Sequence, residues 1–314
     1  MMRALALTGP TASGKTALSL EIARRIGCEI ISLDSMQIYR GMDIGTAKAT
    51  AEEQHAIPHH MLDIVDPTES FSAEDYRLRA LECATDIIVR GKIPLFVGGT
   101  GLYLDTLMRG SSPLSPPSDL ELRERLHKEG ESEEGKDRLY ARLCEVDPDT
   151  AAKTHKNNLR RVVRALEIFE LTGRSKTYFD KASKAASPDV TLCHVTLDFS
   201  DRALLYSRVD ARVDAMIEEG LVDEVRTLYR AGLLTEDSTA AQAIGYKELA
   251  DYLRGESTLE EAIALIKLST RRYAKRQLTW FRHNSDALCI TADTLEREEL
   301  ISLITDYYLG FLND

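Results

Sequence analysis

The sequence predicts an α/β protein in which a parallel sheet is covered by helices and interrupted by a small all-helical segment. Short apolar runs alternate with amphipathic helical spacing in the N-terminal third. A glycine-rich loop joins the first apolar run to the first helix, and a serine- and proline-rich stretch at 111–118 precedes a region with helical patterning only. Strands that alternate with helices pair in parallel, because each helix carries the chain back across the sheet.

Strands are expected where short apolar runs suit a buried parallel sheet. These runs are 4–9, 29–35, 60–66, 93–99, 190–199 and 286–292. In the first part of the chain, helices are expected at 15–26 and 71–91, the second with Ser72 as its N-cap and Gly91 at its end. Later helices are expected at 201–219, 221–231, 239–254, 258–282 and the C-terminus.

The stretch SSPLSPPS at 111–118 indicates a domain boundary. The region that follows contains helical signals only, among them Asp147 and Pro148 at a helix start and Gly173 at a helix end. We therefore expect residues 1–112 to form the first part of the core, 113–189 an inserted helical domain, and 190–314 the continuation of the core with C-terminal helices.

Composition favours a protein of a reducing compartment. The five cysteines are scattered without a C-x-x-C pair, which favours the cytosol, and we find no signal peptide and no apolar stretch long enough to cross a bilayer. The net charge of −11 argues against general nucleic-acid coating. However, 267–283 contains six Lys/Arg and no acid, and 153–176 contains seven Lys/Arg, so two local basic surfaces are expected.

The segment GPTASGKT matches G-x-x-x-x-G-K-[ST] between a predicted strand and a predicted helix. Its glycines let backbone N–H groups turn toward a phosphate, its lysine reaches an outer phosphate, and its threonine can ligate Mg²⁺. A glycine-rich turn without a ligand is the much weaker alternative. The predicted phosphate-binding residues are Gly9, Pro10, Thr11, Ala12, Ser13, Gly14, Lys15 and Thr16.

The usual companions of an NTPase are missing from the sequence, including D-x-x-G, N-K-x-D and an acidic Walker B strand end. Instead, Asp34 follows the second predicted strand and Thr100 follows Gly98 and Gly99 at another, where ligands of parallel sheets bind. Asp34 could accept a proton, or it could simply cap a turn. The two glycines could admit a ligand to the backbone, or could be a plain strand exit.

Arg208 and Arg212 are four residues apart on one predicted helix, so they share a face that could meet a polyanion. Pairing with Asp210 and Asp214 on a solvated surface is at least as good an interpretation of this spacing.

Taken in order, GPTASGKT, DSMQIYRGMDIGTAK, VGGTGLY, NNLRRVVRALEIFELTGR, AIGYKE and RRYAKRQLTWFR resemble the tRNA dimethylallyltransferase family (tRNA isopentenyltransferases, MiaA). The resemblance covers 4–282 and implies a P-loop NTPase-like core. It also implies transfer of a dimethylallyl group from dimethylallyl diphosphate to the N6 amine of adenosine 37, beside the anticodon of tRNA. The phosphate loop would then hold a diphosphate leaving group, with Mg²⁺ at Thr16 as the only metal.

By this resemblance, Lys15 and Arg212, with Arg208 in support, would stabilise the diphosphate, Asp34 would take the amine proton, and Thr100 would lie near the reacting groups. Residues expected to meet tRNA are Asp34, Ser35, Met36, Gln37, Thr100, Arg123, Arg160, Arg161, Arg164, Arg271, Arg272, Lys275 and Arg276. We expect a cytoplasmic monomer that binds the anticodon stem-loop of tRNA and no membrane.

Three alternatives remain at this point. A small-molecule or nucleotide kinase would use the same phosphate loop with ATP. An enzyme that prenylates free AMP or ADP would lack a need for the two basic segments. A non-catalytic RNA-binding protein would have no need for Lys15, Thr16 and Asp34 together.

Overall fold

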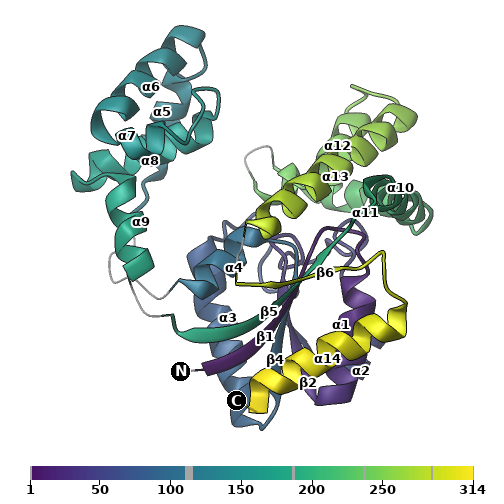
Figure 1. The fold of residues 1–314 in the computed structure, drawn as a ribbon. Coiled ribbons are helices and arrows are strands. Elements are labelled where there is room, and N and C mark those ends of the chain that lie inside the picture. The colour runs from purple at the N-terminus through teal and green to yellow at the C-terminus, as the bar shows by residue number, and fades with distance from the viewer. Residues whose placement is uncertain (1, 110–115, 186–187, 236–237, 284–285, 314) are drawn as a thin grey trace. The chain divides into compact units, whose positions relative to one another are not determined.

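The computed structural model describes residues 2–109, 116–185, 188–235, 238–283 and 286–313, and it divides into two compact units (Figure 1). The first unit comprises Met1–Met108 with Val190–Asp314, and the second comprises Arg109–Asp189. The predicted boundary between residues 112 and 113 lies outside the described residues. Within those residues, no helix combines the length and apolar character that crossing a membrane requires.

The first unit is built on a parallel sheet, which in the described residues has the strand order β3-β2-β4-β1-β5-β6. The strands are β1 (Met2–Thr8), β2 (Cys28–Leu33), β3 (His59–His60), β4 (Ile93–Gly98), β5 (Val190–Asp198) and β6 (Leu288–Thr291). Thr8 pairs with Gly98 on one side and with Thr196 on the other, and Leu33 also pairs with Gly98. The carboxyl ends of the central strands therefore lie at one edge, where an α/β sheet binds its ligands.

Helices cover both faces of this sheet, as the alternation of β1 side chains requires. Leu5 and Leu7 belong to an apolar cluster with α1 (Lys15–Ile26) and α14 (Arg297–Asn313). Ala4 and Ala6 belong to the cluster on the other face, with α3 (Ala73–Val89) and α4 (Gly101–Met108). Figure 1 shows these two helix pairs on either side of the strands.

A second group of helices packs on the loops that leave the sheet. It consists of α10 (Arg202–Glu218), α11 (Leu221–Arg230), the 3₁₀ turn η1 (Ala240–Gln242), α12 (Tyr246–Leu253) and α13 (Leu259–Arg282). Their apolar side chains form one cluster with Ile38, Tyr39, Met42 and Val65. The loop that follows β2 is thus part of a packed core.

The second unit is a helical bundle in which the predicted signals mark the start of one helix and the end of another. It contains α5 (Leu120–Glu129), α6 (Glu133–Val146), α7 (Pro148–Ala151), α8 (Leu159–Thr172) and α9 (Lys176–Ala185). Asp147 caps α7, Pro148 is its first residue, and Gly173 ends α8 in the left-handed conformation. Leu126, Leu139 and Leu166 are buried in its core.

Two element predictions were wrong, and two short helices were missed. The strand expected at 60–66 ends at His60, because Met61 and Asp63 adopt positive φ angles of 63° and 53° that break the ladder. The helix expected at 239–254 is broken between η1 and α12, where Ala243 is extended and Gly245 has φ 95°. Helix α2 (Ala51–Ala56), with a capping box at Thr50, lies where no element was predicted, and so does helix α4, which begins at Gly101.

Candidate active site

A cavity of about 350 Å³ opens at the carboxyl ends of the strands, and all of its lining residues belong to the first unit. The phosphate loop, the end of β2, the end of β4, α10 and α13 each contribute to its wall. Predicted site residues in the lining are Thr11, Lys15, Thr16, Asp34, Ser35, Met36, Gln37, Arg212 and Arg276. The fold therefore brings together residues that lie as far apart in sequence as Thr11 and Arg276.

The phosphate loop has a geometry suited to an anion. Gly9 has φ 148° and Gly14 has φ 85°, and between them Ala12 has φ 61°. Helix α1 begins at Lys15 without a side-chain cap, so its first N–H groups remain available to a ligand. The Lys15 ammonium donates to the carbonyl of Pro10 at 2.6 Å and to the Ser13 hydroxyl at 3.3 Å, so the lysine lies folded over its own loop.

Gln277 of α13 ties the phosphate loop to the end of β4. Its Oε1 accepts from the Thr11 amide at 2.9 Å, and its Nε2 donates to the Gly99 carbonyl at 2.9 Å. A Cβ on Gly99 would lie 2.1 Å from this Nε2, so the close approach requires glycine. Gln277 is not among the residues predicted from the sequence; the signal that could have found it is a polar residue among the apolar positions of that helix.

Asp34 is half-buried in the cavity wall, near enough to Lys15 and Arg212 for both cations to affect its pKa. Its Oδ1 accepts from the Met36 amide at 2.8 Å, so the turn-capping geometry is present, but the carboxylate also lines the cavity. Burial raises its pKa, outweighing the opposing effects of backbone amides, Lys15 and Arg212. Burial, followed by repulsion from Arg212, lowers the pKa of Lys15 to about 7. Burial also lowers the pKa of Arg212.

The charges in this wall favour an anionic ligand. Among the described lining residues Asp34 is the one carboxylate, and Lys15, Arg212 and Arg276 are cations. Cations that are held away from water gain most from a bound anion that restores their lost solvation. A diphosphate is an anion of this kind.

Thr100 is held at the junction of β2 and β4. Its Oγ1 accepts from the Ser35 amide at 3.0 Å, and its own amide donates to the Leu33 carbonyl at 3.1 Å. The backbone approach here is close, since a Cβ on Gly98 would lie 2.1 Å from the Leu33 carbonyl oxygen. Thr100 is thus fixed beside the residue that follows Asp34.

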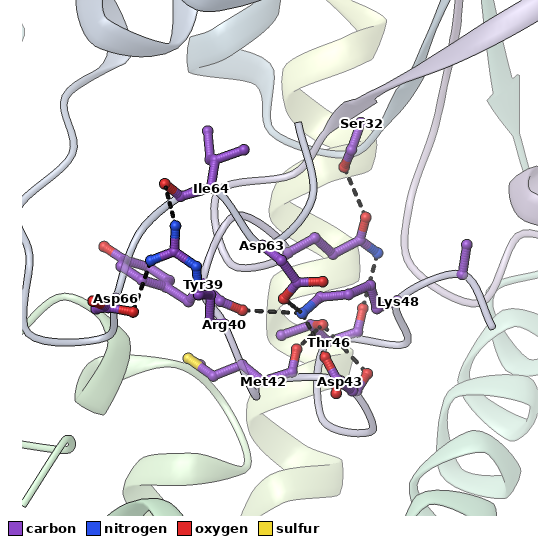
Figure 2. A network of polar contacts seen from close by, with 12 residues as sticks. Ser32, Tyr39, Arg40, Met42, Asp43, Thr46, Lys48, Asp63, Ile64 and Asp66 are labelled. Atoms are coloured by element: carbon purple, nitrogen blue, oxygen red, sulfur yellow. Dashed lines mark hydrogen bonds and ion pairs between the residues drawn. The ribbon is translucent and has the colours of Figure 1, made fainter. Parts of the chain in front are cut away.

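Gln37 lies in the cavity wall with its amide group engaged inside the protein. Its Nε2 donates to the carbonyls of Thr46 and Ala47 at 3.1 and 3.2 Å, and its Oε1 accepts from the Ser32 hydroxyl at 2.7 Å. Figure 2 shows Ser32 and Thr46 on the two sides of this network. Both amide hydrogens are used, so the Gln37 side chain has no N–H left for a base.

The two arginines of α10 differ in their surroundings. Arg212 lines the cavity, whereas Arg208 is exposed, with its guanidinium carbon 5.4 Å from the centre of the Phe199 ring. The alternative interpretation, in which Arg208 and Arg212 pair with Asp210 and Asp214, does not agree with the described ion pairs. Asp210 instead pairs with Arg271 at 2.6 Å, and Asp214 pairs with Lys267 at 2.6 Å.

The other predicted RNA contacts fall into two groups. Arg160, Arg161, Arg272 and Lys275 are exposed, and exposed Arg276 also lies over the Tyr273 ring at 5.6 Å. In the second unit, Arg123 and Arg164 both bind the buried carboxylate of Glu167, at 3.1 and 2.9 Å. Arg271 is engaged with Asp210, as described above. These three arginines already have carboxylate partners within the protein.

Oxygen donors at the phosphate loop fit a magnesium ion that is bound mainly through a substrate. The Thr16 hydroxyl and the Asp34 carboxylate both line the cavity. Mg²⁺ is commonly held by one or two protein oxygens together with phosphate oxygens and water. Within the described ranges, no cluster of three His, Cys, Asp or Glu side chains could hold a metal by itself.

Comparison with known proteins places this architecture among tRNA-modifying transferases. The family model described as IPP transferase matches residues 37–284, and that described as isopentenyl transferase matches residues 2–71. The tRNA dimethylallyltransferase of Thermoanaerobacter sp. (strain X514) is 46% identical over 309 residues, covering 98% of each chain. That of Halalkalibacterium halodurans is 44% identical over 310 residues, covering 99% of this chain and 98% of the relative.

Solved structures agree with the sequence comparison. The full-length tRNA isopentenylpyrophosphate transferase from Bacillus halodurans superposes with a TM-score of 0.74 at 43% identity, covering 100% of this chain and 97% of that one. A eukaryotic dimethylallyltransferase acting on tRNA superposes with a TM-score of 0.79 at 31% identity, covering 99% of this chain and 80% of that one.

Proposed function

This chain belongs to the IPP transferase family, the tRNA dimethylallyltransferases, and from that premise we propose how its cavity performs the reaction. The enzyme transfers a dimethylallyl group to the N6 amine of adenosine 37 in tRNA, and the comparisons do not favour the kinase alternative. We propose that the donor is dimethylallyl diphosphate. The observation that carries the assignment of roles is a half-buried carboxylate, Asp34, that shares one cavity with Lys15, Arg212 and the phosphate loop.

The diphosphate would lie against the phosphate loop. In the reaction the bond between the allylic carbon and the diphosphate oxygen breaks, and the leaving diphosphate takes the electron pair. Charge therefore grows on the phosphate oxygens, where the loop amides, Lys15 and Arg212 stabilise it. Mg²⁺ bound through the Thr16 hydroxyl would neutralise further charge on these oxygens.

Asp34 would act on the acceptor. The N6 nitrogen of the adenine forms the new bond to the allylic carbon, and one of its two hydrogens passes as a proton to the Asp34 carboxylate. Burial raises the pKa of Asp34, which makes the carboxylate a better base than one in water. Thr100, fixed against the Ser35 amide, would help to hold the reacting groups in line.

The RNA backbone would meet exposed basic side chains in each unit. In the first unit these are Arg272, Lys275 and Arg276 on α13, and in the second unit Arg160 and Arg161 on α8. The contributions of Arg123, Arg164 and Arg271 would be smaller, because their guanidinium groups are paired with carboxylates. We further propose that the enzyme acts as a monomer in the cytosol, where its five unpaired cysteines stay reduced.

One mixture tests the reaction. Purified protein, Mg²⁺, dimethylallyl diphosphate and an anticodon stem-loop should yield RNA that is heavier by one dimethylallyl group, together with free diphosphate. The Asp34→Asn variant keeps an acceptor for the Met36 amide but cannot take a proton, so kcat should fall by roughly 10²–10⁴-fold with stem-loop affinity unchanged. Asp66→Asn, a change in a surface ion pair with Arg40, is the control and should leave kcat unchanged. An equal loss of turnover and RNA affinity in Asp34→Asn would contradict the role of Asp34.

A further inference from the structure

Part of the cavity wall is an irregular loop whose backbone must be held by something other than a helix or a sheet. Gly45, Thr46 and Ala47 line the cavity, and Ala47 has a positive φ of 47°. A non-glycine residue in this conformation carries strain and persists only where the surroundings enforce it. The contacts that enforce this loop therefore determine the shape of the site.

One end of the loop lies on the carboxylate of Glu224 in α11. Its Oε2 accepts from the amides of Asp43 and Ile44 at 3.0 and 2.8 Å, and its Oε1 accepts from the Gly45 amide at 3.2 Å. Three successive N–H groups that converge on one anion form a nest, a backbone arrangement that ordinarily binds an external anion. Here the anion is supplied by the protein's own helix.

Tyr246 completes the binding of Glu224. Its buried hydroxyl donates to Glu224 Oε1 at 2.6 Å, and its ring fills the space beside Gly45. A Cβ on Gly45 would lie 2.5 Å from Tyr246 Cε2. Tyr246 itself lines the cavity, so Glu224 connects two parts of the same wall.

Lys48 and Gln37 anchor the loop in addition to Glu224. The buried side chain of Lys48 donates to the Tyr39 carbonyl at 3.0 Å and to the carboxylates of Asp43 and Asp63 at 2.5 and 2.6 Å (Figure 2). Gln37 holds the carbonyls of Thr46 and Ala47 from the side of β2. Gln37 follows Asp34 by only three residues, so its bonds to the loop fix the loop relative to the part of the cavity wall that contains Asp34.

We propose that Glu224 is a positioning residue for the acceptor side of the cavity: it fixes the Asp43–Gly45 backbone and thereby places the lining segment Gly45–Ala47, against which the target purine lies. This inference rests on the proposed function, in which Asp34 receives the amine proton. The Glu224 carboxylate bonds no amide of the phosphate loop among the described contacts, so its loss should affect the RNA substrate and spare the donor.

The isosteric variant Glu224→Gln tests the proposal, because it presents an NH₂ group where the nest needs an acceptor. We expect kcat/KM for the stem-loop to fall by roughly tenfold or more, with KM for dimethylallyl diphosphate changed by less than about twofold. The neighbouring Asp223→Asn, whose carboxylate pairs with Arg226 on the surface, is the matched control and should behave as the parent enzyme. Hydrogen exchange should show faster exchange at the amides of Asp43, Ile44 and Gly45 in Glu224→Gln only.

Faster exchange at these amides with unchanged kinetics would overturn the proposal, as would an equal rise in KM for both substrates. If the parent enzyme leaves the RNA unmodified, the proposed function is refuted instead. That result is obtained with the parent enzyme alone, before any variant is tested. If Glu224→Gln does not fold, Tyr246→Phe supplies the test, since it removes one of the four hydrogen bonds to Glu224. It should raise KM for the stem-loop about twofold to threefold at constant donor KM, and no change would again overturn the proposal.

Discussion

Gln277 bridges the phosphate loop and the end of β4, and we predict how much this bridge contributes to stability and to binding of the donor. The Gln277 side chain is 5% exposed and bonds the Thr11 amide and the Gly99 carbonyl. The variant Gln277→Leu keeps the approximate volume of the side chain and removes both hydrogen bonds. The perturbation therefore isolates the polar bridge from the packing of α13.

The size of the effect follows from the two backbone groups left behind. An unsatisfied buried donor or acceptor costs about 1–3 kcal/mol, and the more apolar leucine offsets about 1–2 kcal/mol of the total. With the middle of each range, two unsatisfied groups cost about 4 kcal/mol and leucine offsets about 1.5 kcal/mol, so we expect the free energy of unfolding to fall by about 2.5 kcal/mol. The Thr11 amide would also lose its fixed direction, so KM for dimethylallyl diphosphate should rise by roughly tenfold while stem-loop affinity stays unchanged.

Equilibrium unfolding in urea measures the first quantity, and steady-state kinetics with each substrate varied in turn measures the second. Thr279→Ala is the control, because within the described part of the chain its exposed hydroxyl bonds the Lys275 carbonyl of its own helix and no other group. That change should alter the free energy of unfolding by less than about 0.5 kcal/mol. A loss of less than about 1 kcal/mol in Gln277→Leu with unchanged donor KM would refute the reasoning.

Three further predictions concern buried charge. Burial lowers the pKa of His194 from 6.5 to about 4. The free energy of unfolding, measured in urea, should therefore fall by about 3 kcal/mol as the pH falls from 6.5 to 4, and His194→Gln should remove most of this loss. Burial would raise the pKa of Glu167, but hydrogen bonds from the Asp119 amide, Arg123 and Arg164 hold this pKa below 4.5. Glu167→Gln should therefore lower the free energy of unfolding of the second unit by about 1–3 kcal/mol. This difference should disappear in acid, where the Glu167 carboxylate of the parent is protonated. Burial raises the pKa of Asp34 above 3.8, so its charged carboxylate destabilises the fold at neutral pH. Urea unfolding at pH 7 should therefore find Asp34→Asn at least as stable as the parent. The difference should fade below pH 3.8, where the carboxyl group is protonated in both the folded and the unfolded state.

Features that depend on neighbours in the chain were predictable. The phosphate loop, the start of α1 at Lys15 and the caps at Ser72, Asp147 and Gly173 arise from short-range torsional and hydrogen-bonding preferences. The place of Asp34 at a strand end followed from the alternation of strands and helices. The errors, at 60–66 and at 239–254, lie where positive φ angles or an extended residue interrupt an otherwise regular pattern.

Sequence alone determined the chemistry available to this protein: a phosphate loop, a carboxylate at the sheet edge and basic helices. Each of these can be recognised from residues that lie close together in the sequence. Tertiary structure alone decided which groups meet. It separated Arg212 in the cavity from Arg208 at the surface, and it joined Gln277 to Thr11 and Glu224 to the Asp43–Gly45 amides across gaps of more than 170 residues. Such contacts depend on how whole helices pack against the sheet, and local spacing does not encode that geometry.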